Sequence, residues 1–407
     1  MGVESSEAEK FIGCIGEPWL FKATSLYGAT VMSLKSIPFV ALLSLLLAIA
    51  TCPAFCAEPD EAVPKKLAAF FHPPKEFADD LGDYRSPLVF HDGRRVKTAA
   101  DWKLRRREII DRWHKIMGPW PPLVEKPKIE YIANEQRDHL TQHQVRVEIA
   151  PGGKTVEGYL LVPEGKGPFP AVVVVFYDAK TGAGLGKGLL DFGYQLARRG
   201  FVALSIGTPP TRYYPNEQSA QLQPLSSQAY CAANLYNALA NLPRVDARRI
   251  GIVGHSYGGK WAMFASCLYD KFACAAWSDG GIVFDEKRSN VNYWDRWYLG
   301  HEPGNRRREG RPGKDNPRTG AYKQLVEQGH DLHELHALMA PRPLLVSGGS
   351  EDRPERWRAL NHAVAVNKLL GHTHRVAMTN RPGHTPTAES NEQMYLFLEH
   401  FLKAMAR

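Results

Sequence analysis

Short apolar runs that alternate with helical segments constrain the fold of this chain more than any other feature. The runs are almost wholly apolar, like strands buried on both faces of a parallel sheet, and they cover 171–176, 201–206, 250–253, 273–277, 343–346 and 375–378. Segments with helical spacing of apolar residues separate them, at 189–199, 226–241, 259–268, 355–370 and 392–403. This alternation predicts an α/β fold with a mostly parallel central sheet and helices on both of its faces.

The stretch before these runs has a different pattern. Val145, Val147 and Ile149 alternate with polar residues, two glycines follow at 152–153, and a second strand-like stretch covers 156–162. Alternation at period two on both sides of a glycine turn indicates a half-buried antiparallel hairpin. We therefore expect an antiparallel N-terminal hairpin that leads into the parallel sheet.

The segment Gly254-His255-Ser256-Tyr257-Gly258 lies between an apolar strand and a helix. A sharp turn at this point presents a hydroxyl at the carboxyl edge of the sheet, and the flanking glycines let neighbouring backbones pass. Ser256 is therefore the predicted nucleophile of a serine hydrolase. The N–H of Tyr257, at the helix start, is a predicted donor to an oxyanion, and Tyr177 or Asp178 supplies the second donor after run 171–176.

A serine hydroxyl at neutral pH needs a base, and in this kind of site the chain order is nucleophile, acid, histidine. His384 follows the last predicted strand, in the loop before the terminal helix, and is the predicted base. The acid is expected after the penultimate strand, where Asp352 is the first choice and Glu351 the second. Asp279, after the preceding strand, is a third candidate, although its place ahead of two glycines favours a turn role.

The rest of the chain divides into an arm, a core and an insertion. The Pro-rich arm at 58–128 contains a helix-like stretch at 99–117, whose spaced aromatic residues are expected to pack the arm on the core. The predicted catalytic domain covers 129–407. Within it, about 282–331 has no convincing strand and is aromatic and then basic, which is typical of a lid or binding loop.

The first 57 residues have the pattern of a leader with a signal peptide. Lys35 precedes an apolar stretch at 37–50, and small residues follow. The stretch is shorter than the roughly 20 residues that span a bilayer, so no stable membrane insertion is expected after removal, although an N-terminal anchor is the alternative. Met32 starts a more conventional signal, and is a possible true start. This pattern predicts a secreted or periplasmic protein.

Charge and cysteine content narrow the partners. The formal charge is +8 and the pI about 9.0, with short basic clusters at 105–107 and 306–308, but no nucleic-acid-binding module accompanies them, so no nucleic-acid partner is expected. Cys231, Cys267 and Cys274 remain after the leader, too few for a disulfide framework, and a Cys267–Cys274 pair is left open. No Cys/His spacing predicts a metal site, and no cofactor is expected.

The stretch from about 129 onward resembles bacterial α/β hydrolases of the dienelactone hydrolase and acetyl xylan esterase kind, and within these the glucuronoyl-esterase relatives. The segments that carry the resemblance are 254–260, 338–346 with 350–352, and 382–384. The resemblance implies the α/β-hydrolase fold. It also implies a sugar contact from Lys260, four residues after the serine. Those enzymes place an arginine directly after the serine to steady the oxyanion, where this chain has Tyr257.

The resemblance and the motif together predict a secreted serine carboxylic-ester hydrolase that acts on polysaccharide esters of the acetyl or glucuronoyl type. Trp294 and Trp297 are expected to stack on a sugar, with a role in the hydrophobic core of a lid as the alternative. The turn at 254–258 that carries Ser256, called the nucleophile elbow, also resembles the corresponding turn of prolyl oligopeptidases. A serine peptidase is therefore an alternative activity. A non-catalytic carbohydrate-binding protein on a hydrolase scaffold is another alternative. The expected partner is a small-molecule or polysaccharide ester, and the oligomeric state is left open.

Overall fold

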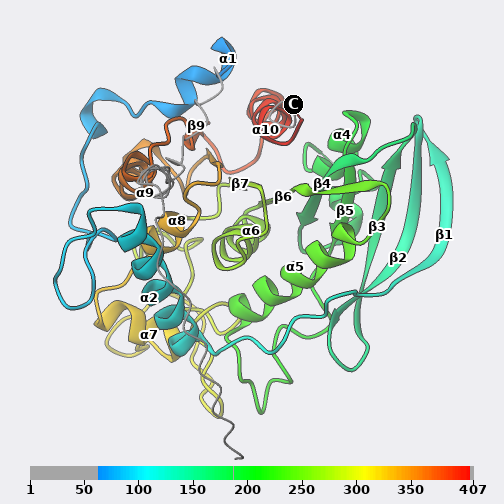
Figure 1. Cartoon of the computed structure of the whole chain (residues 1–407). Helices are drawn as coiled ribbons and strands as arrows, with labels where there is room; N and C mark the ends of the chain where they lie inside the picture. The colour runs from blue at the N-terminus through cyan, green and yellow to red at the C-terminus, as the bar shows by residue number, and fades with distance from the viewer. Residues whose placement is uncertain (1–62, 187, 404–407) are drawn as a thin grey trace, which may run out of the picture. The chain divides into compact units, whose positions relative to one another are not determined.

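The computed structural model describes residues 63–186 and 188–403, so the predicted leader lies outside the described residues. One sheet runs through this part of the chain in the order β1-β2-β3-β5-β4-β6-β7-β8-β9 (Figure 1). The strands are β1 (Ile129–Arg137), β2 (Leu140–Ala150), β3 (Lys154–Pro163), β4 (Phe169–Val175), β5 (Val202–Ile206), β6 (Val245–His255), β7 (Cys274–Ser278), β8 (Leu344–Gly348) and β9 (Val376–Asn380).

The strand directions confirm the predicted fold class. β2 and β3 form an antiparallel hairpin around the turn at Gly152 and Gly153, and β1 adds to it in antiparallel sense. β3 joins β5, again antiparallel, and from β5 to β9 every neighbouring pair is parallel. The carboxyl ends of β4 to β9 therefore meet at one edge of the sheet, where a site is expected.

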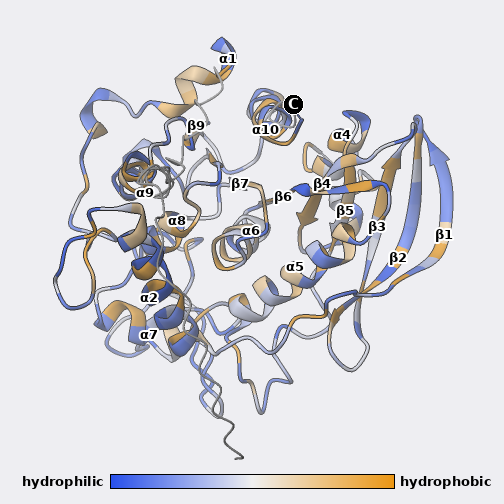
Figure 2. Cartoon of the chain, viewed as in Figure 1, coloured by the Kyte–Doolittle hydropathy of each residue, from blue (hydrophilic) through white to orange (hydrophobic). Residues whose placement is uncertain are grey.

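The central strands are buried on both faces, which explains their continuous apolar runs. In β4, Ala171, Val173 and Val175 belong to one hydrophobic cluster, while Val172 and Val174 belong to a second cluster on the other face. Figure 2 shows the contrast between the apolar central strands and the largely hydrophilic β1.

Helices cover each face of the sheet. Residues of six α-helices join the first cluster: α2 (Ala99–Met117), α5 (Pro224–Ala240), α6 (Tyr257–Leu268), α7 (Gly320–Glu327), α8 (His333–Leu338) and α9 (Trp357–Leu369). Residues of three α-helices join the second cluster: α1 (Lys65–Ala68), α4 (Phe192–Arg198) and α10 (Ala388–Lys403). Short helical turns complete the connections at α3 (Ala179–Gly182) and η3 (Pro354–Arg356).

The N-terminal arm packs on the core at several places, of which one is its long helix and a second is a helical turn near its start. Its helical elements are α1 (Lys65–Ala68), η1 (Ala69–Phe71), η2 (Lys75–Phe77) and α2 (Ala99–Met117). A capping box between Thr98 and Asp101 starts α2, and Trp113 on its buried face donates a hydrogen bond to Glu334 (3.0 Å). The second place is η1, which lies against β9 and inserts Phe71 into the cluster around α10.

Between β7 and α8, residues 282–331 contain one helix, α7 (Gly320–Glu327), and no sheet strand. Tyr293, Trp294 and Tyr298 are all buried in the main hydrophobic cluster, so this segment packs as part of the core.

Cys231, Cys267 and Cys274 are buried free thiols, so the Cys267–Cys274 pair considered from the sequence is not formed. Over residues 63–186 and 188–403, no helix is both long and apolar enough to cross a membrane.

Candidate active site

Ser256 occupies a strained turn between β6 and α6. Its φ of 56° and ψ of −113° are rare for a residue with a side chain, and the surrounding structure holds them. The turn needs glycines on both sides. A Cβ at Gly258 would lie 2.0 Å from the carbonyl oxygen of Val175, and one at Gly254 would lie 2.3 Å from the carbonyl oxygen of Gly258. The sequence motif is therefore a packing requirement that raises the Ser256 hydroxyl above the sheet edge.

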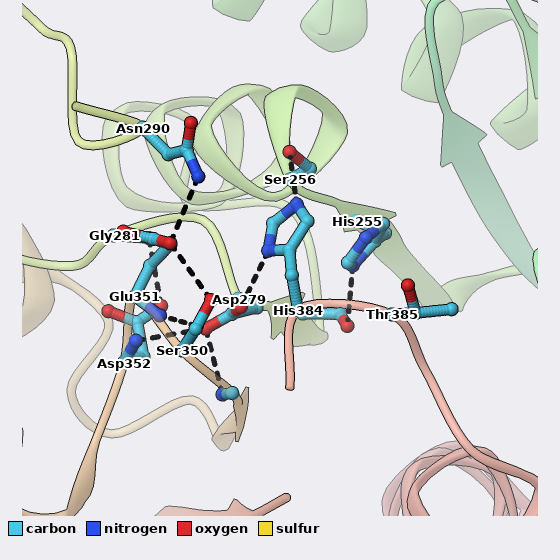
Figure 3. Close-up of polar contacts among 12 residues, drawn as sticks. His255, Ser256, Asp279, Gly281, Asn290, Ser350, Glu351, Asp352, His384 and Thr385 are labelled. Atoms are coloured by element: carbon cyan, nitrogen blue, oxygen red, sulfur yellow. Dashed lines mark hydrogen bonds and ion pairs between the residues drawn. The ribbon is translucent and has the colours of Figure 1, made fainter. Parts of the chain in front are cut away.

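A continuous line of hydrogen bonds joins Ser256, His384 and Asp279 (Figure 3). The Ser256 Oγ lies 2.9 Å from the Nε2 of His384, in the loop between β9 and α10. The Nδ1 of His384 lies 2.6 Å from the Oδ2 of Asp279, the residue after β7. With the ring proton on Nδ1, His384 donates to Asp279 and accepts the serine proton at Nε2.

The acid in this line is Asp279 and not Asp352, which corrects the first choice made from the sequence. Asp279 has a φ of 47°, and its side chain has no exposure to solvent. Its Oδ1 accepts three backbone N–H groups from the loop after β8: Gly349 (2.8 Å), Glu351 (3.1 Å) and Asp352 (2.9 Å). Burial alone would raise the pKa of Asp279, but the hydrogen bonds from His384 and from the Asp352 backbone hold that pKa below its usual range.

Asp352 is fully buried and points to the loop after β7. Its carboxylate accepts the N–H groups of Gly281 (2.8 Å) and Ile282 (2.7 Å). Burial, together with the nearby charge of Asp279, raises the pKa of Asp352 to about 6. The runner-up, Glu351, accepts hydrogen bonds from Asn290 (3.1 Å) and Ser350 (2.9 Å), so it too is engaged away from His384.

Two further charged or titratable side chains surround His384. His255 is buried with its ring 4.6 Å from that of His384, and burial is the main cause that lowers the pKa of His255 to about 3, so the ring stays neutral. Arg381 donates to the carbonyl oxygens of His384 (2.6 Å) and Ser347 (2.8 Å). Arg381 therefore ties the loop that carries His384 to the end of β8.

The predicted oxyanion donors lie next to one another. Tyr257 is the first residue of α6, and the N–H of a helix's first residue has no partner inside the helix. The Tyr177 ring stacks on the Tyr257 ring, with centroids 4.4 Å apart and planes 16° apart, which brings the loop after β4 to the start of α6. Asp178 caps α3 through its carboxylate, which accepts the Lys180 N–H (3.0 Å). Neither contact involves the backbone N–H of Tyr177 or of Asp178, so both remain candidates for the second donor.

The predicted sugar contacts are only partly where the sequence suggested. Lys260 is 3% exposed, and its Nζ donates to the carbonyl oxygen of Asn290 (2.9 Å). Burial lowers the pKa of Lys260 to about 8 despite the carboxylates nearby. Trp294 is 1% exposed and packs edge-on against Tyr322, so the expectation that it stacks on a sugar is corrected: its ring is part of the core. Trp297 is only half-buried and keeps a surface that a ligand could meet.

Arg212 was not singled out from the sequence, yet it reaches the same region from the loop after β5. Its guanidinium carbon lies 5.6 Å from the ring centre of Tyr257 and 5.6 Å from that of Trp297. Its Nε is buried without a hydrogen-bond partner, and within the part of the chain that the structure describes no carboxylate pairs with it. An arginine in a loop without a motif gives no signal in the sequence. Only the folded structure brings the positive charge of Arg212 next to Tyr257.

Two protein families match parts of the chain. The model of the esterase FrsA-like family matches residues 130–289, and that of the prolyl oligopeptidase family matches 232–407. A 4-O-methyl-glucuronoyl methylesterase from Podospora anserina is 23% identical over 288 residues, which cover 66% of this chain and 55% of that protein. The chain thus spans about half the length of this curated relative.

Solved structures share the fold. A glucuronoyl esterase from Solibacter usitatus superposes with a TM-score of 0.61 at 18% identity, over 78% of this chain and 97% of that one. A putative acetyl xylan esterase from Bacteroides fragilis superposes with a TM-score of 0.52 at 14% identity, over 81% of this chain and 90% of that one.

The sheet topology and the solved structures show that the chain has the α/β-hydrolase fold. Among proteins of this fold it is similar to FrsA-like and glucuronoyl esterases and to an acetyl xylan esterase, as the Ser256 motif and the C-terminal loops suggested.

Proposed function

We propose that the protein is a serine carboxylic-ester hydrolase that acts on polysaccharide esters of the acetyl or glucuronoyl type. The observation that carries the proposal is the hydrogen-bonded line from Ser256 through His384 to the buried Asp279. The similarity to esterases named for sugar esters supports the substrate class.

In the proposed reaction, the Ser256 Oγ attacks the ester carbonyl while the Nε2 of His384 takes the serine proton. Asp279 holds the imidazole in the tautomer that can accept at Nε2 and stabilises the imidazolium that forms. The oxyanion of the tetrahedral intermediate accepts the N–H of Tyr257 and an N–H from Tyr177 or Asp178. His384 then gives its proton to the departing alcohol. In the second half of the reaction water attacks the acyl-serine ester while His384 takes the water proton, and His384 then returns this proton to the Oγ of Ser256.

Arg212 adds a positive charge beside the side chain of Tyr257, whose backbone N–H is a proposed oxyanion donor. Glucuronoyl esterases, which the sequence resembles, carry an arginine directly after the nucleophile. This chain has Tyr257 at that position, and the Arg212 guanidinium lies next to the Tyr257 ring. We expect Arg212 to favour the developing negative charge electrostatically, because no carboxylate in the described residues neutralises it.

The N-terminal leader pattern supports export, and we propose that the enzyme works outside the cytoplasm. An enzyme outside the cytoplasm encounters polymeric glycan esters, which agrees with the proposed substrate class.

The experiment that tests the proposal combines a covalent probe with a substrate panel. A fluorophosphonate probe should label the wild-type protein at Ser256 and leave Ser256→Ala unlabelled. Wild type should hydrolyse p-nitrophenyl acetate together with acetylated xylan or methyl glucuronate, and Ser256→Ala should lose essentially all of this activity. Labelling at another residue, or full activity in Ser256→Ala, would overturn the proposal. Complete inactivity with no labelling would favour a non-catalytic carbohydrate-binding protein.

A peptidase is the second candidate, because the prolyl oligopeptidase family model matches residues 232–407. That elbow and triad order serve amide and ester cleavage alike, so the fold does not separate them. A proline-containing peptide anilide discriminates: cleavage of it at a higher kcat/KM than any ester in the panel would favour the peptidase.

A further inference from the structure

A polar groove lies beside the proposed active site, along the antiparallel end of the sheet. It consists of two adjoining hollows of about 680 and 440 Å³, which share Gln144, Tyr159 and Lys180 in their walls. We call the two together the hairpin groove. Each hollow has the size of a ligand site, and neither contains Ser256, His384 or Asp279 in its lining.

The pairing of the strands forms the floor of the hairpin groove. Tyr159 on β3 pairs with Gln144 on β2, and Gln144 pairs with Ala133 on β1, so these residues form one row across three strands. Because paired residues point to the same face, the row presents an aromatic ring, an amide and a small methyl group side by side. Neighbouring strands are about 4.8 Å apart, so this row alone is about 10 Å long, enough for more than one sugar ring.

The groove begins at the proposed oxyanion loop. Tyr177, Asp178 and Thr208 line its larger hollow. Tyr177 stacks on Tyr257, and the Thr208 hydroxyl lies 3.5 Å from the Tyr257 hydroxyl. β4 and β5 lie beside β6 in the sheet, and the larger hollow is linked to Tyr257, the residue after Ser256, through the contacts of Tyr177 and Thr208. A chain bound in the groove would lie between this loop region and the hairpin.

The side chains in the groove suit a hydroxyl-rich ligand. Lys180 is exposed and pairs with no carboxylate among the described residues, and the Gln144 amide likewise has no partner there. Tyr177 is 60% exposed while one face of its ring is covered by Tyr257, so the other face is available for stacking. A sugar chain can form hydrogen bonds with the unpaired donor and the unpaired amide, and it can stack on the exposed aromatic face. The larger hollow is lined by two cationic side chains, Arg146 and Lys180, and two carboxylates, Glu157 and Asp178, so it has no net positive charge to attract a nucleic-acid backbone.

We propose that the hairpin groove binds the glycan chain that carries the ester, so that it acts as a polymer subsite next to the catalytic serine. This inference rests on the proposed function, and it adds a place where the enzyme distinguishes a polymer-borne ester from a small one. Binding energy from such a remote contact raises kcat/KM for the polymer and leaves small esters unaffected.

Variants in the groove away from the catalytic residues test the proposal. Gln144→Ala combined with Lys180→Ala removes two surface donors, and Tyr159→Ala removes the aromatic ring that both hollows share. Kinetics on acetylated xylan or on methyl-esterified glucuronoxylan are compared with kinetics on p-nitrophenyl acetate. The matched control is Tyr131→Ala, an exposed tyrosine of β1 that lines neither hollow and instead contacts His143.

We expect kcat/KM on the polymer to fall about tenfold in the double variant while that on p-nitrophenyl acetate stays within about twofold, as the loss of one or two hydrogen bonds predicts. Tyr131→Ala should change neither. An unchanged ratio between polymer and small ester in both groove variants would overturn the groove proposal while leaving the esterase intact. Inactivity of the wild type on every ester would instead overturn the proposed function.

A binding measurement completes the test when the polymer is not cleaved. Ser256→Ala should be retarded in a gel that contains glucuronoxylan, and adding the double substitution should restore free migration. Equal migration with and without the double substitution would contradict the proposal.

Discussion

Asp279 and Asp352 each hold the loop that carries the other. The Oδ1 of Asp279 accepts the backbone N–H of Asp352, and the carboxylate of Asp352 accepts the N–H groups of Gly281 and Ile282, just beyond Asp279. Only Asp279 has an oxygen left for His384. The two acids therefore have different tasks, which mutation can separate.

Replacing Asp279 by Asn should lower kcat on p-nitrophenyl acetate by about 10³–10⁴-fold, because an amide no longer selects the productive tautomer of His384. Asp352→Asn should cost less than about tenfold, since it touches no reacting group. Steady-state kinetics with both variants at matched folding, judged by circular dichroism, measure the difference. A larger loss in Asp352→Asn than in Asp279→Asn would contradict the assignment.

Asp352 should also make stability depend on pH. Its pKa is about 6 in the folded protein against 3.8 for an ordinary aspartate, so the folded state binds the proton more tightly. Below about pH 4 the Asp352 carboxyl is protonated in both the folded and the unfolded state, so the free energy of unfolding does not change with its titration. As the pH rises through 6 the carboxylate becomes charged in the buried site, and the free energy of unfolding falls by up to about 3 kcal/mol. The Tm difference between wild type and Asp352→Asn, followed from pH 4 to 7.5, should therefore shift in favour of the variant. A difference independent of pH would show that the charge is not the cause.

Lys260 should make substrate affinity depend on pH on the alkaline side. Its pKa of about 8 means that its charge is lost as the pH rises through 8. Because the Lys260 charge is the expected sugar contact, KM for a methyl glucuronate should increase several-fold between pH 7 and 9.5, while KM for p-nitrophenyl acetate stays flat. Lys260→Met should have the raised KM at every pH. A rise that persists in Lys260→Met would place its origin in another group.

Arg212→Met should lower kcat for small and large esters alike, by about 10- to 100-fold, because the charge beside Tyr257 acts on the transition state. Arg212→Lys should retain part of the rate. Arg296→Met is the matched control: its guanidinium also lies over Trp297, at 5.5 Å, but Glu217 neutralises it at 3.6 Å. Equal effects of the Arg212 and Arg296 changes would contradict a specific role.

Arg381 should act as a positioning residue. Arg381→Met removes the hydrogen bonds to the carbonyl oxygens of His384 and Ser347, so His384 should spend less time aligned with Ser256. We expect kcat to fall about tenfold or more with KM nearly unchanged, and Arg381→Lys to recover part of kcat. A change confined to KM would assign Arg381 to substrate binding instead.

Part of this site was accessible from the sequence because it is encoded locally. Ser256 lies in a short motif between a strand and a helix, and His384 follows the last strand in the chain order of such sites. The local sequence does not determine whether Asp279 or Asp352 contacts the histidine. It depends on which of two neighbouring strand ends faces the histidine, and both present an acid in a glycine-rich loop. Trp294 was misassigned because an aromatic-rich insertion looks the same whether its rings face solvent or, as here, the core.

The contact between the N-terminal arm and the last strand has a consequence for solubility. β9 ends the sheet, and a bare edge strand offers its backbone to the edge strand of another molecule. Here η1 lies along β9, and Phe71 packs against Phe397 and Phe401. The opposite edge, β1, is protected differently, by charged residues and a bulge near Tyr131. The arm thus shields the enzyme from edge-to-edge aggregation.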